Sequence, residues 1–290
     1  MKGIILAAGS GSRLHPLTKV ISKQLLTIYD KPMIYYPLST LMLAGIKEIL
    51  IITTEKDNHL FRILLGDGSK LGINIEYAIQ KKPSGLPEAF VIGKDFIGKN
   101  NVCMILGDNI FHSDTFINKY LIPSFERNIS TIFGYYVNDP KRYGVIELDN
   151  NKNILSIKEK PETPRSNYAI TGLYVFDKNA SDIAKELLPS ERGETEITDM
   201  MNYYLKNNSL KAELLGRGVT WLDTGTHKSL HDASSYIQVL EERQGLKIAC
   251  IEEIAYQRNY ISKDQLIELA EPLKNNEYGK YLKQVLNQKI

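Results

Sequence analysis

A glycine-rich turn near the N-terminus is the first segment whose residues could do chemistry. An apolar run ends at Ala8 and leads into Gly9-Ser10-Gly11-Ser12, which Arg13 follows directly. Backbone N–H groups of such a turn can surround a phosphate, and glycine allows close approach of the ligand. A guanidinium adds bidentate recognition of phosphate oxygens. The turn predicts a phosphate site, with an ordinary Gly/Ser loop as the alternative.

Two named phosphate motifs do not fit this turn. The dinucleotide fingerprint needs a third glycine where Leu14 stands, and the P-loop needs a Gly-Lys-Ser/Thr sequence that is absent here. Lys23 follows further along the chain and can bring a point charge close to the same turn. The phosphate site therefore belongs to neither of these two classes.

Two aspartates each follow a strand-like apolar run. Asp108 comes after residues 102–106, and Asp223 ends residues 219–222. In parallel α/β folds ligands bind at the carboxyl edge of the sheet, which is where Asp108 would stand. Taken alone, either aspartate could equally cap a helix or close a turn.

The segments that must position these side chains alternate between strand and helix patterns. Strand-like runs at 3–8, 48–54, 74–80 and 102–107 are separated by helix-length segments at 32–44, 56–65 and 86–96. This rhythm predicts a doubly wound α/β core whose mostly parallel sheet is covered on both faces.

Beyond Asp108 the pattern changes. Strand-like runs at 131–137, 143–148, 154–158 and 168–176 predict antiparallel or mixed additions to the sheet. Helical patterns follow at 178–188 and 198–206, then a strand-like run at 210–215 and a largely helical tail from Thr226. We expect a catalytic core over residues 1–225 and a helical extension over residues 226–290 that packs on it as a single folded unit.

Composition excludes several classes of protein. The 290 residues include 36 Lys+Arg and 34 Asp+Glu, a formal charge of +2 without blocks of like charge, which argues against nucleic-acid and membrane-surface binding. No apolar run approaches the roughly 18 residues of a membrane span. Cys103 and Cys250 form no C-x-x-C or disulfide framework. We expect a soluble, cytoplasmic protein with no nucleic-acid or membrane partner.

A series of short motifs runs along nearly the whole chain. They lie, in order, at residues 9–18, 22–26, 29–37, 106–109, 142–145, 159–161, 167–174, 193–199 and 221–226. Each motif is modest alone, but in this order the series resembles the sugar-phosphate nucleotidylyltransferases. Within that family the chain is similar to the short bacterial group that acts on dTTP and glucose 1-phosphate. The resemblance implies a Rossmann-like nucleotidyltransferase core.

The resemblance also implies a reaction. A phosphate oxygen of glucose 1-phosphate would attack the α-phosphorus of dTTP in line, giving dTDP-glucose and pyrophosphate, the first step of dTDP-L-rhamnose and deoxysugar synthesis. Asp108 and Asp223 match the carboxylates that bind Mg²⁺, an ion that needs few protein oxygens. Arg13 would act on the leaving pyrophosphate, Lys23 near the α-phosphate and Lys160 on the sugar phosphate. The nucleophile is already ionised, so no general base is needed.

The resemblance implies two groups of binding residues. The implied nucleotide site consists of Gly9, Ser10, Gly11, Ser12, Arg13, Lys23, Gln80, Gly85 and Asp108, with Gln80 and Gly85 at the positions that read the thymine. The implied sugar-phosphate site consists of Tyr143, Gly144, Glu159, Lys160, Thr171 and Glu194. Residues 85–89 read Gly-Leu-Pro-Glu-Ala, where the family commonly has Gly-Leu-Ala-Gln-Ala, and this departure lies next to the base.

Assembly and regulation are further implications of the resemblance. The short group forms a homotetramer and has a second nucleotide site for feedback by dTDP-rhamnose. The family commonly places arginine directly after the tyrosine at position 256, whereas this chain has Gln257 and then Arg258. The departure predicts weak feedback.

Other functions compete with this interpretation. A UTP-dependent uridylyltransferase is the alternative within the same chemistry, and a non-catalytic sugar-nucleotide regulator is the alternative outside it. A metal-dependent glycosyltransferase would normally need a D-x-D pair, which the sequence lacks. His227 and His231 have the spacing of helical metal ligands, but no third ligand follows, so a solvated helix end is preferred.

Overall fold

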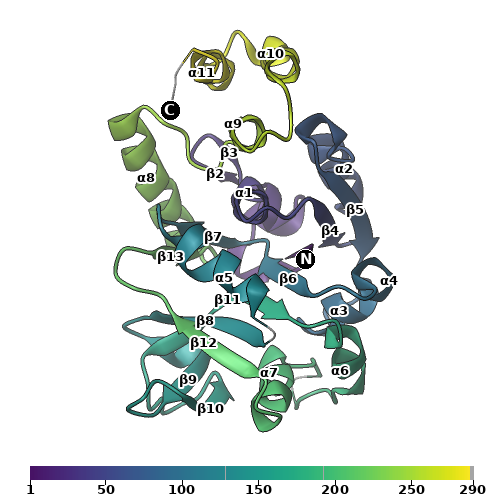
Figure 1. The fold of residues 1–290 in the computed structure, drawn as a ribbon, viewed down its shortest axis with the longest axis vertical. Coiled ribbons are helices and arrows are strands. Elements are labelled where there is room, and N and C mark those ends of the chain that lie inside the picture. Colours follow the sequence, from purple (N-terminus) through teal and green to yellow (C-terminus); the bar gives the residue numbers. More distant parts are fainter. Residues whose placement is uncertain (128, 192, 288–290) are drawn as a thin grey trace.

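The computed structural model describes residues 1–127, 129–191 and 193–287. Within this part, nine strands form one sheet in the order β10-β9-β11-β6-β1-β4-β5, with β8 beside β11 and β12 beside β8 (Figure 1). These strands are β1 (Lys2–Ala7), β4 (Glu48–Thr53), β5 (Asn74–Ile79), β6 (Val102–Leu106), β8 (Ser130–Tyr136), β9 (Gly144–Leu148), β10 (Ile154–Glu159), β11 (Tyr168–Phe176) and β12 (Leu210–Leu214). The mixed α/β sheet predicted from the sequence is confirmed.

The N-terminal half of the sheet is parallel and covered on both faces. β1 pairs in parallel with β4 and β6, and β4 pairs in parallel with β5. Ile5 and Ala7 belong to the core on one face, whereas Ile4 and Leu6 belong to the core on the other, because strand side chains alternate. The doubly wound arrangement is therefore confirmed.

Different helices cover the two faces. Residues of α1 (Tyr35–Leu43) and α2 (Asn58–Leu65) contribute to the first core. Residues of α3 (Glu88–Ile92), α4 (Lys94–Ile97), α6 (Ala180–Glu186) and α7 (Ile197–Lys206) contribute to the second. The single helix expected over residues 86–96 is wrong, because the backbone leaves the helical conformation at Gly93 and divides the segment into α3 and α4.

The second half of the sheet is mixed, as predicted. β11 runs antiparallel to β6, β8 and β9, and β10 runs antiparallel to β9. β12 is parallel to β8. Shorter helical elements lie along the chain: the π-helical turn η5 (Ile117–Leu121), α5 (Ile122–Glu126) and the 3₁₀ turns η1 (Ser12–Leu14), η2 (Leu17–Lys19), η3 (Lys23–Leu25), η4 (Ser69–Leu71), η6 (Pro140–Arg142) and η7 (Glu271–Leu273).

A short two-stranded ribbon, which the sequence did not predict in full, lies beside the end of β6. β7 (Asn109–His112) follows Asp108 and pairs antiparallel with β13 (Thr220–Asp223), so that Asp223 stands opposite Asn109. A second ribbon joins β2 (Thr27–Ile28) to β3 (Lys31–Pro32). The first ribbon brings the segments of the two predicted metal carboxylates together.

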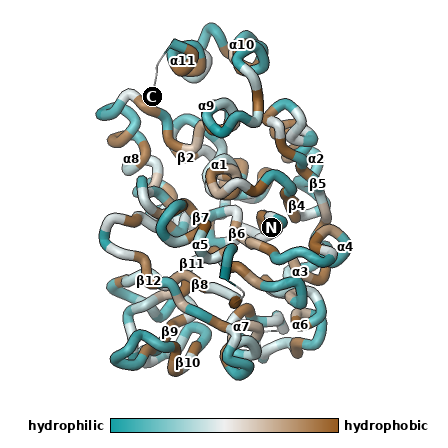
Figure 2. The backbone as a smooth tube through the Cα atoms, viewed as in Figure 1, coloured by the Kyte–Doolittle hydropathy of each residue, from teal (hydrophilic) through white to brown (hydrophobic). Residues whose placement is uncertain are grey.

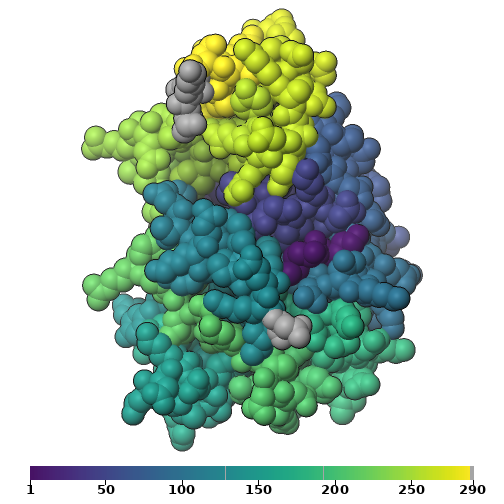
Figure 3. Space-filling model, in the orientation of Figure 1, coloured from purple at the N-terminus to yellow at the C-terminus, as the bar shows by residue number. Residues whose placement is uncertain are grey.

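The C-terminal region is helical, as expected. It contains α8 (His227–Gln244), α9 (Ile251–Gln257), α10 (Lys263–Ala270) and α11 (Glu277–Val285). Figure 2 shows brown, hydrophobic stretches alternating with teal ones along the outer helices α8, α10 and α11. The yellow C-terminal helices rest against the blue segment that contains α1 and α2 (Figure 3), and residues of α9, α10 and α11 share the core of α1.

A buried ion pair ties α8 to the N-terminal region. The Lys31 ammonium lies 2.8 Å from a carboxylate oxygen of Glu241, and Lys31 is 1% exposed. Among the described residues, no helix has the length and apolar character that crossing a bilayer requires.

Candidate active site

A cavity of about 550 Å³ opens at the carboxyl ends of β1 and β6. Ala8 and Asp108, which follow these two strands, line it, as expected for a ligand site in an α/β sheet. The predicted site residues that line it are Gly9, Ser10, Arg13, Lys23, Gln80, Gly85, Asp108, Tyr143, Gly144, Glu159, Lys160, Glu194 and Asp223. The structure thus gathers segments far apart in sequence into one cavity.

Gly11, Ser12 and Thr171 are the predicted residues that do not line this cavity. Gly11 has a left-handed backbone, and its carbonyl oxygen accepts a hydrogen bond from the Thr18 hydroxyl at 2.6 Å. It shapes the turn, while Gly9, Ser10 and Arg13 face the cavity.

Thr171 lies on the other side of its strand. Its neighbours Ile170 and Gly172 line the cavity, whereas Thr171 is fully buried. Within the described part of the chain its hydroxyl has no hydrogen-bond partner. The Thr171 side chain points away from the cavity, because strand side chains alternate between faces, so a sugar contact at this position stays a prediction and would involve the backbone.

Asp108 and Lys23 form an ion pair on the floor of the cavity. Lys23 Nζ contacts Asp108 Oδ2, and the side chains are 10% and 12% exposed. Burial alone would raise the pKa of Asp108, but the adjacent Lys23 ammonium and the Asn109 amide hold this pKa below its ordinary value. In the substrate-free protein Asp108 is therefore an ionised carboxylate, whose oxygens can bind a cation.

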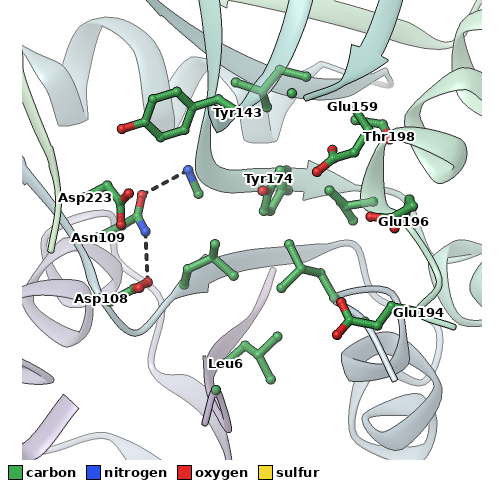
Figure 4. A pocket seen from close by; sticks show the side chains of 18 of the residues that line it. Leu6, Asp108, Asn109, Tyr143, Glu159, Tyr174, Glu194, Glu196, Thr198 and Asp223 are labelled. Carbon is green, nitrogen blue, oxygen red and sulfur yellow. Dashed lines mark hydrogen bonds between the residues drawn. The ribbon is translucent and has the colours of Figure 1, made fainter. Parts of the chain in front are cut away.

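Asp223 stands beside this pair under different electrostatics. Burial and the negative charge of Asp108 raise the pKa of Asp223 above its ordinary value. The guanidinium of Arg142 approaches Asp223 Oδ2 at 3.8 Å. Figure 4 shows Asp223 next to Asn109, with Asp108 below them. A buried and a half-buried carboxylate that repel each other form a site that a cation would stabilise.

The donor set at this position fits a hard divalent cation. Among the described residues, no three His, Cys, Asp or Glu side chains cluster as metal ligands. Two carboxylates nevertheless suffice for Mg²⁺, which keeps several waters and takes phosphate oxygens from the substrate. Asp108 and Asp223, which both line the cavity, therefore form a donor set compatible with such an ion.

Glu159 and Lys160 both line the cavity although they are neighbours in sequence. A regular strand would send them to opposite faces, but β10 ends at Glu159 and Lys160 has a φ of 39°. The Lys160 N–H donates to the Tyr143 carbonyl at 3.0 Å, and Lys160 Nζ lies 3.2 Å from Glu159 Oε1. This left-handed turn therefore presents a carboxylate and an ammonium together.

The opposite end of the cavity carries the predicted base-reading residues. Gln80 Nε2 donates to the Gly85 carbonyl at 3.2 Å and to Glu88 Oε2 at 2.6 Å. Gly85 forms an isolated bridge with Thr195, next to the predicted sugar contact Glu194. This backbone contact therefore holds the segment of Glu194 beside the predicted base-reading segment.

Several cavity residues had no role in the sequence-based prediction, namely Asn109, Arg142, Thr198 and Trp221. All four belong to motifs that carry the resemblance and lie in the same motifs as predicted site residues. The Trp221 ring meets the Tyr143 ring edge to face, with centroids 5.3 Å apart. A polar or aromatic residue inside a motif was the signal available, but only the fold shows which of them face the cavity.

Comparisons with known proteins agree with this geometry. The sequence pattern of the Nucleotidyl transferase family matches residues 2–239. The chain is 56% identical, over 97% of its length and 95% of the relative's, to the glucose-1-phosphate thymidylyltransferase of Xanthomonas campestris pv. campestris (strain B100).

Two solved structures share the fold. One, from Bacillus anthracis, is assigned as a glucose-1-phosphate thymidylyltransferase in complex with sucrose. It has a TM-score of 0.74 and 40% sequence identity, and the match covers 81% of this chain and 94% of the Bacillus anthracis chain. The other is a UDP-glucose pyrophosphorylase complexed with UDP-glucose, with a TM-score of 0.74 and 25% identity, covering 82% of this chain and 98% of its own.

Proposed function

Since the chain belongs to the nucleotidyl transferase family, we propose that it joins dTTP to glucose 1-phosphate and releases dTDP-glucose and pyrophosphate. One observation carries this proposal. A single cavity is lined by the Arg13 guanidinium, the Lys23 ammonium and Lys160 beside Glu159. Two anionic substrates need this distribution of positive charge before they can meet.

The chain's own residues supply orientation and charge. Gly9 and Ser10 line the cavity directly after β1, where their backbone can approach the triphosphate. Arg13 would stabilise charge that develops on the leaving pyrophosphate, and Lys160 would hold the ionised phosphate of the sugar. Glu159 can accept hydrogen bonds from sugar hydroxyls. Holding both substrates in line supplies much of the rate enhancement through effective molarity.

A divalent metal is typical of this family, and we propose Mg²⁺ held by Asp108 and Asp223. When bound, it would neutralise phosphate oxygens and favour the in-line geometry. Because Lys23 contacts Asp108 directly, this lysine can balance the carboxylate before metal and nucleotide bind.

We also propose the finer features that the family resemblance implies. They are a homotetramer, a cytoplasmic location, a catalytic core over residues 1–225 with an extension over residues 226–290, and a role in deoxysugar synthesis with dTDP-rhamnose as a feedback effector. Two contacts support weak feedback: Gln257 Nε2 donates to Glu253 at 3.0 Å, and the Arg258 guanidinium contacts the Leu43 carbonyl.

A uridylyltransferase is the second candidate, favoured by the structural likeness to a UDP-glucose pyrophosphorylase. Uracil and thymine present the same hydrogen-bonding edge, so the contacts of Gln80 suit both bases. The two functions differ in which triphosphate gives the higher kcat/KM.

Pyrophosphate release tests the proposal. Purified protein with Mg²⁺ and glucose 1-phosphate receives dTTP, UTP, dCTP or dATP in turn, and dTTP should give the highest kcat/KM. Asp223→Asn should lose most turnover while remaining folded, whereas Asp264→Asn, on the exposed start of α10, is the matched control. A preference for UTP would favour the second candidate, and absence of pyrophosphate with every triphosphate would reject both.

A further inference from the structure

Asn109 stands between the two aspartates of the candidate active site, at the start of β7. It is 3% exposed. Its Nδ2 donates to Asp108 Oδ1 at 3.0 Å, and its Oδ1 accepts from Trp221 Nε1 at 2.6 Å and from the Gly172 N–H at 3.1 Å. One side chain therefore connects the end of β6 with β11 and β13.

The partners determine which way the amide points. Trp221 Nε1 and the Gly172 N–H are donors only, so both must meet the amide oxygen. The nitrogen then has to face Asp108, whose carboxylate is an acceptor. The orientation of the Asn109 amide follows from this donor and acceptor chemistry.

Packing leaves the amide little freedom to move. A Cβ added at Gly172 would lie 2.7 Å from both Cγ and Oδ1 of Asn109, closer than a Cβ atom approaches other heavy atoms in proteins. Figure 4 shows Asn109 bonded to Asp108 below and to a backbone nitrogen on its other side, with Asp223 alongside. The Asn109 amide can occupy this position only because residue 172 has no side chain.

Asp108 is held by a different donor on each oxygen. Lys23 contacts Oδ2 and Asn109 donates to Oδ1. Two donors at opposite oxygens fix the plane of a carboxylate, which a single ion pair does not. The backbone pairing of β7 with β13 places Asp223 opposite Asn109, and the Asn109 side chain also accepts from Trp221 of β13. Asn109 is therefore bonded both to Asp108 and to the strand that ends at Asp223.

We propose that Asn109 is a positioning residue that aligns the Asp108 and Asp223 carboxylates to bind a divalent cation. The inference rests on the proposed function, because it assigns to these aspartates the metal that the nucleotidyl transfer would use. Asn109 itself touches neither substrate nor the reacting atoms in this account. Residues that hydrogen-bond to metal-binding side chains fix the orientation of those side chains, and their loss typically weakens metal binding about 10- to 100-fold.

The test measures metal binding in the absence of substrates, with Mn²⁺ as the probe and water-proton relaxation as the signal. Asn109→Ala removes the amide. Asn167→Ala is its control, because the Asn167 amide also donates a short internal hydrogen bond, to the Val137 carbonyl at 2.7 Å, away from the aspartates. Asn109→Ala should weaken Mn²⁺ binding about tenfold or more, and Asn167→Ala should leave it within about twofold of wild type.

A second variant displaces the amide without removing any polar group. Gly172→Ala should push Asn109 out of place and weaken Mn²⁺ binding in the same direction. Gly218→Ala is the matched control, because nothing lies within 4 Å of a Cβ at Gly218. If Asn109→Ala does not fold, Gly172→Ala decides the test. Mn²⁺ affinity within about twofold of wild type in a folded Asn109→Ala or Gly172→Ala protein would overturn the inference.

Kinetics separate this inference from the proposed function. In the Asn109→Ala enzyme kcat should fall at fixed Mg²⁺ and recover in part at higher Mg²⁺, with the KM for glucose 1-phosphate nearly unchanged. A wild-type protein that binds Mn²⁺ but never releases pyrophosphate would reject the proposed function, while the variants would still decide the role of Asn109.

Discussion

The side-chain Nε2 of Gln80 donates a hydrogen bond of 2.6 Å to the Glu88 carboxylate, at the end of the cavity where the base is expected. The same nitrogen also reaches the Gly85 carbonyl at 3.2 Å. Both partners are acceptors, so the NH₂ group faces them and Oε1 is the atom left for a ligand. An acceptor suits the N3–H donor of thymine and uracil and does not suit cytosine, whose N3 is itself an acceptor.

Glu88→Ala should therefore relax the choice of nucleotide. Without the carboxylate the Gln80 amide can turn, and the ratio of kcat/KM for dTTP over dCTP should fall about threefold to tenfold, the value of roughly one hydrogen bond. The ratio is measured by pyrophosphate release in competition. Glu76→Ala, at an exposed position of β5, serves as control. An unchanged ratio in Glu88→Ala would show that the carboxylate does not orient Gln80.

Gly85→Ala should damage both the fold and the nucleotide site. Gly85 has a φ of 108°, and a Cβ there would lie 2.0 Å from the Thr195 carbonyl oxygen, so the backbone bridge between Gly85 and Thr195 would break. Urea unfolding should show a loss of about 3 kcal/mol or more, in the range of a severe steric clash. The KM for dTTP should rise.

Gly45→Ala is the matched control for that variant. Gly45 also has a positive φ, of 84°, but nothing lies within 4 Å of the added Cβ. It should lose only the roughly 1–2 kcal/mol of a left-handed alanine. Equal losses in the two variants would mean that backbone strain, and not the contact with Thr195, accounts for the effect at Gly85.

Glu252 should make the protein less stable as the pH rises. Burial raises the pKa of this carboxyl above its ordinary 4.5, although the Tyr278 hydroxyl donates to it at 2.6 Å. Between pH 4.5 and the raised pKa the folded state binds more protons than the unfolded state, so the free energy of unfolding decreases with increasing pH. Glu252→Gln keeps an acceptor for Tyr278 and should remove this contribution.

Urea unfolding at pH 5 and pH 8 measures that effect. At pH 8 Glu252→Gln should be more stable than wild type, and the advantage should shrink at pH 5. Glu268→Gln, at an exposed position of α10, is the control and should follow wild type at both pH values. A stability difference between Glu252→Gln and wild type that is the same at both pH values would contradict the assignment.

Much of the fold could be predicted because each strand of the parallel half is itself a short, nearly continuous apolar run in the sequence. The apolar run at residues 3–8 became β1 (Lys2–Ala7), since a strand buried on both faces is almost continuously hydrophobic. β7 was missed because Asn109–His112 is short and pairs only with the distant β13. That pairing is long-range, and no local pattern in either segment records it.

The candidate site shows the same division between local and long-range information. The glycine-rich turn and Asp108 follow strands directly, so their place at the sheet edge could be predicted. The face of Thr171 could not, because β11 is buried on both faces and its register shifts between Ile170 and Tyr174. Hydrophobic alternation then carries no information on which side chains face the cavity. The role of Asn109 depends on contacts with three strands and was likewise invisible in the sequence.

Replacing Lys23 or Lys160 by methionine should affect the stability of the protein to different extents. Lys23 is buried against Asp108, so Lys23→Met leaves a buried carboxylate without its counter-ion and should cost about 3–5 kcal/mol of unfolding free energy. The Lys160 side chain is 48% exposed, and its Nζ lies 3.2 Å from Glu159 Oε1. Its replacement should change stability by less than about 1 kcal/mol.

Ligand binding should show the complementary difference. Lys160→Met should weaken glucose 1-phosphate binding, because the left-handed turn at Lys160 presents this ammonium to the sugar phosphate, and should leave dTTP binding nearly unchanged. The loss should be about tenfold or more, the value of one charge-assisted hydrogen bond. Calorimetric titration of each substrate measures this, with Lys158→Met, at the exposed lysine of β10, as control. Equal losses for the two substrates in Lys160→Met would show that Lys160 serves the whole cavity and not the sugar phosphate alone.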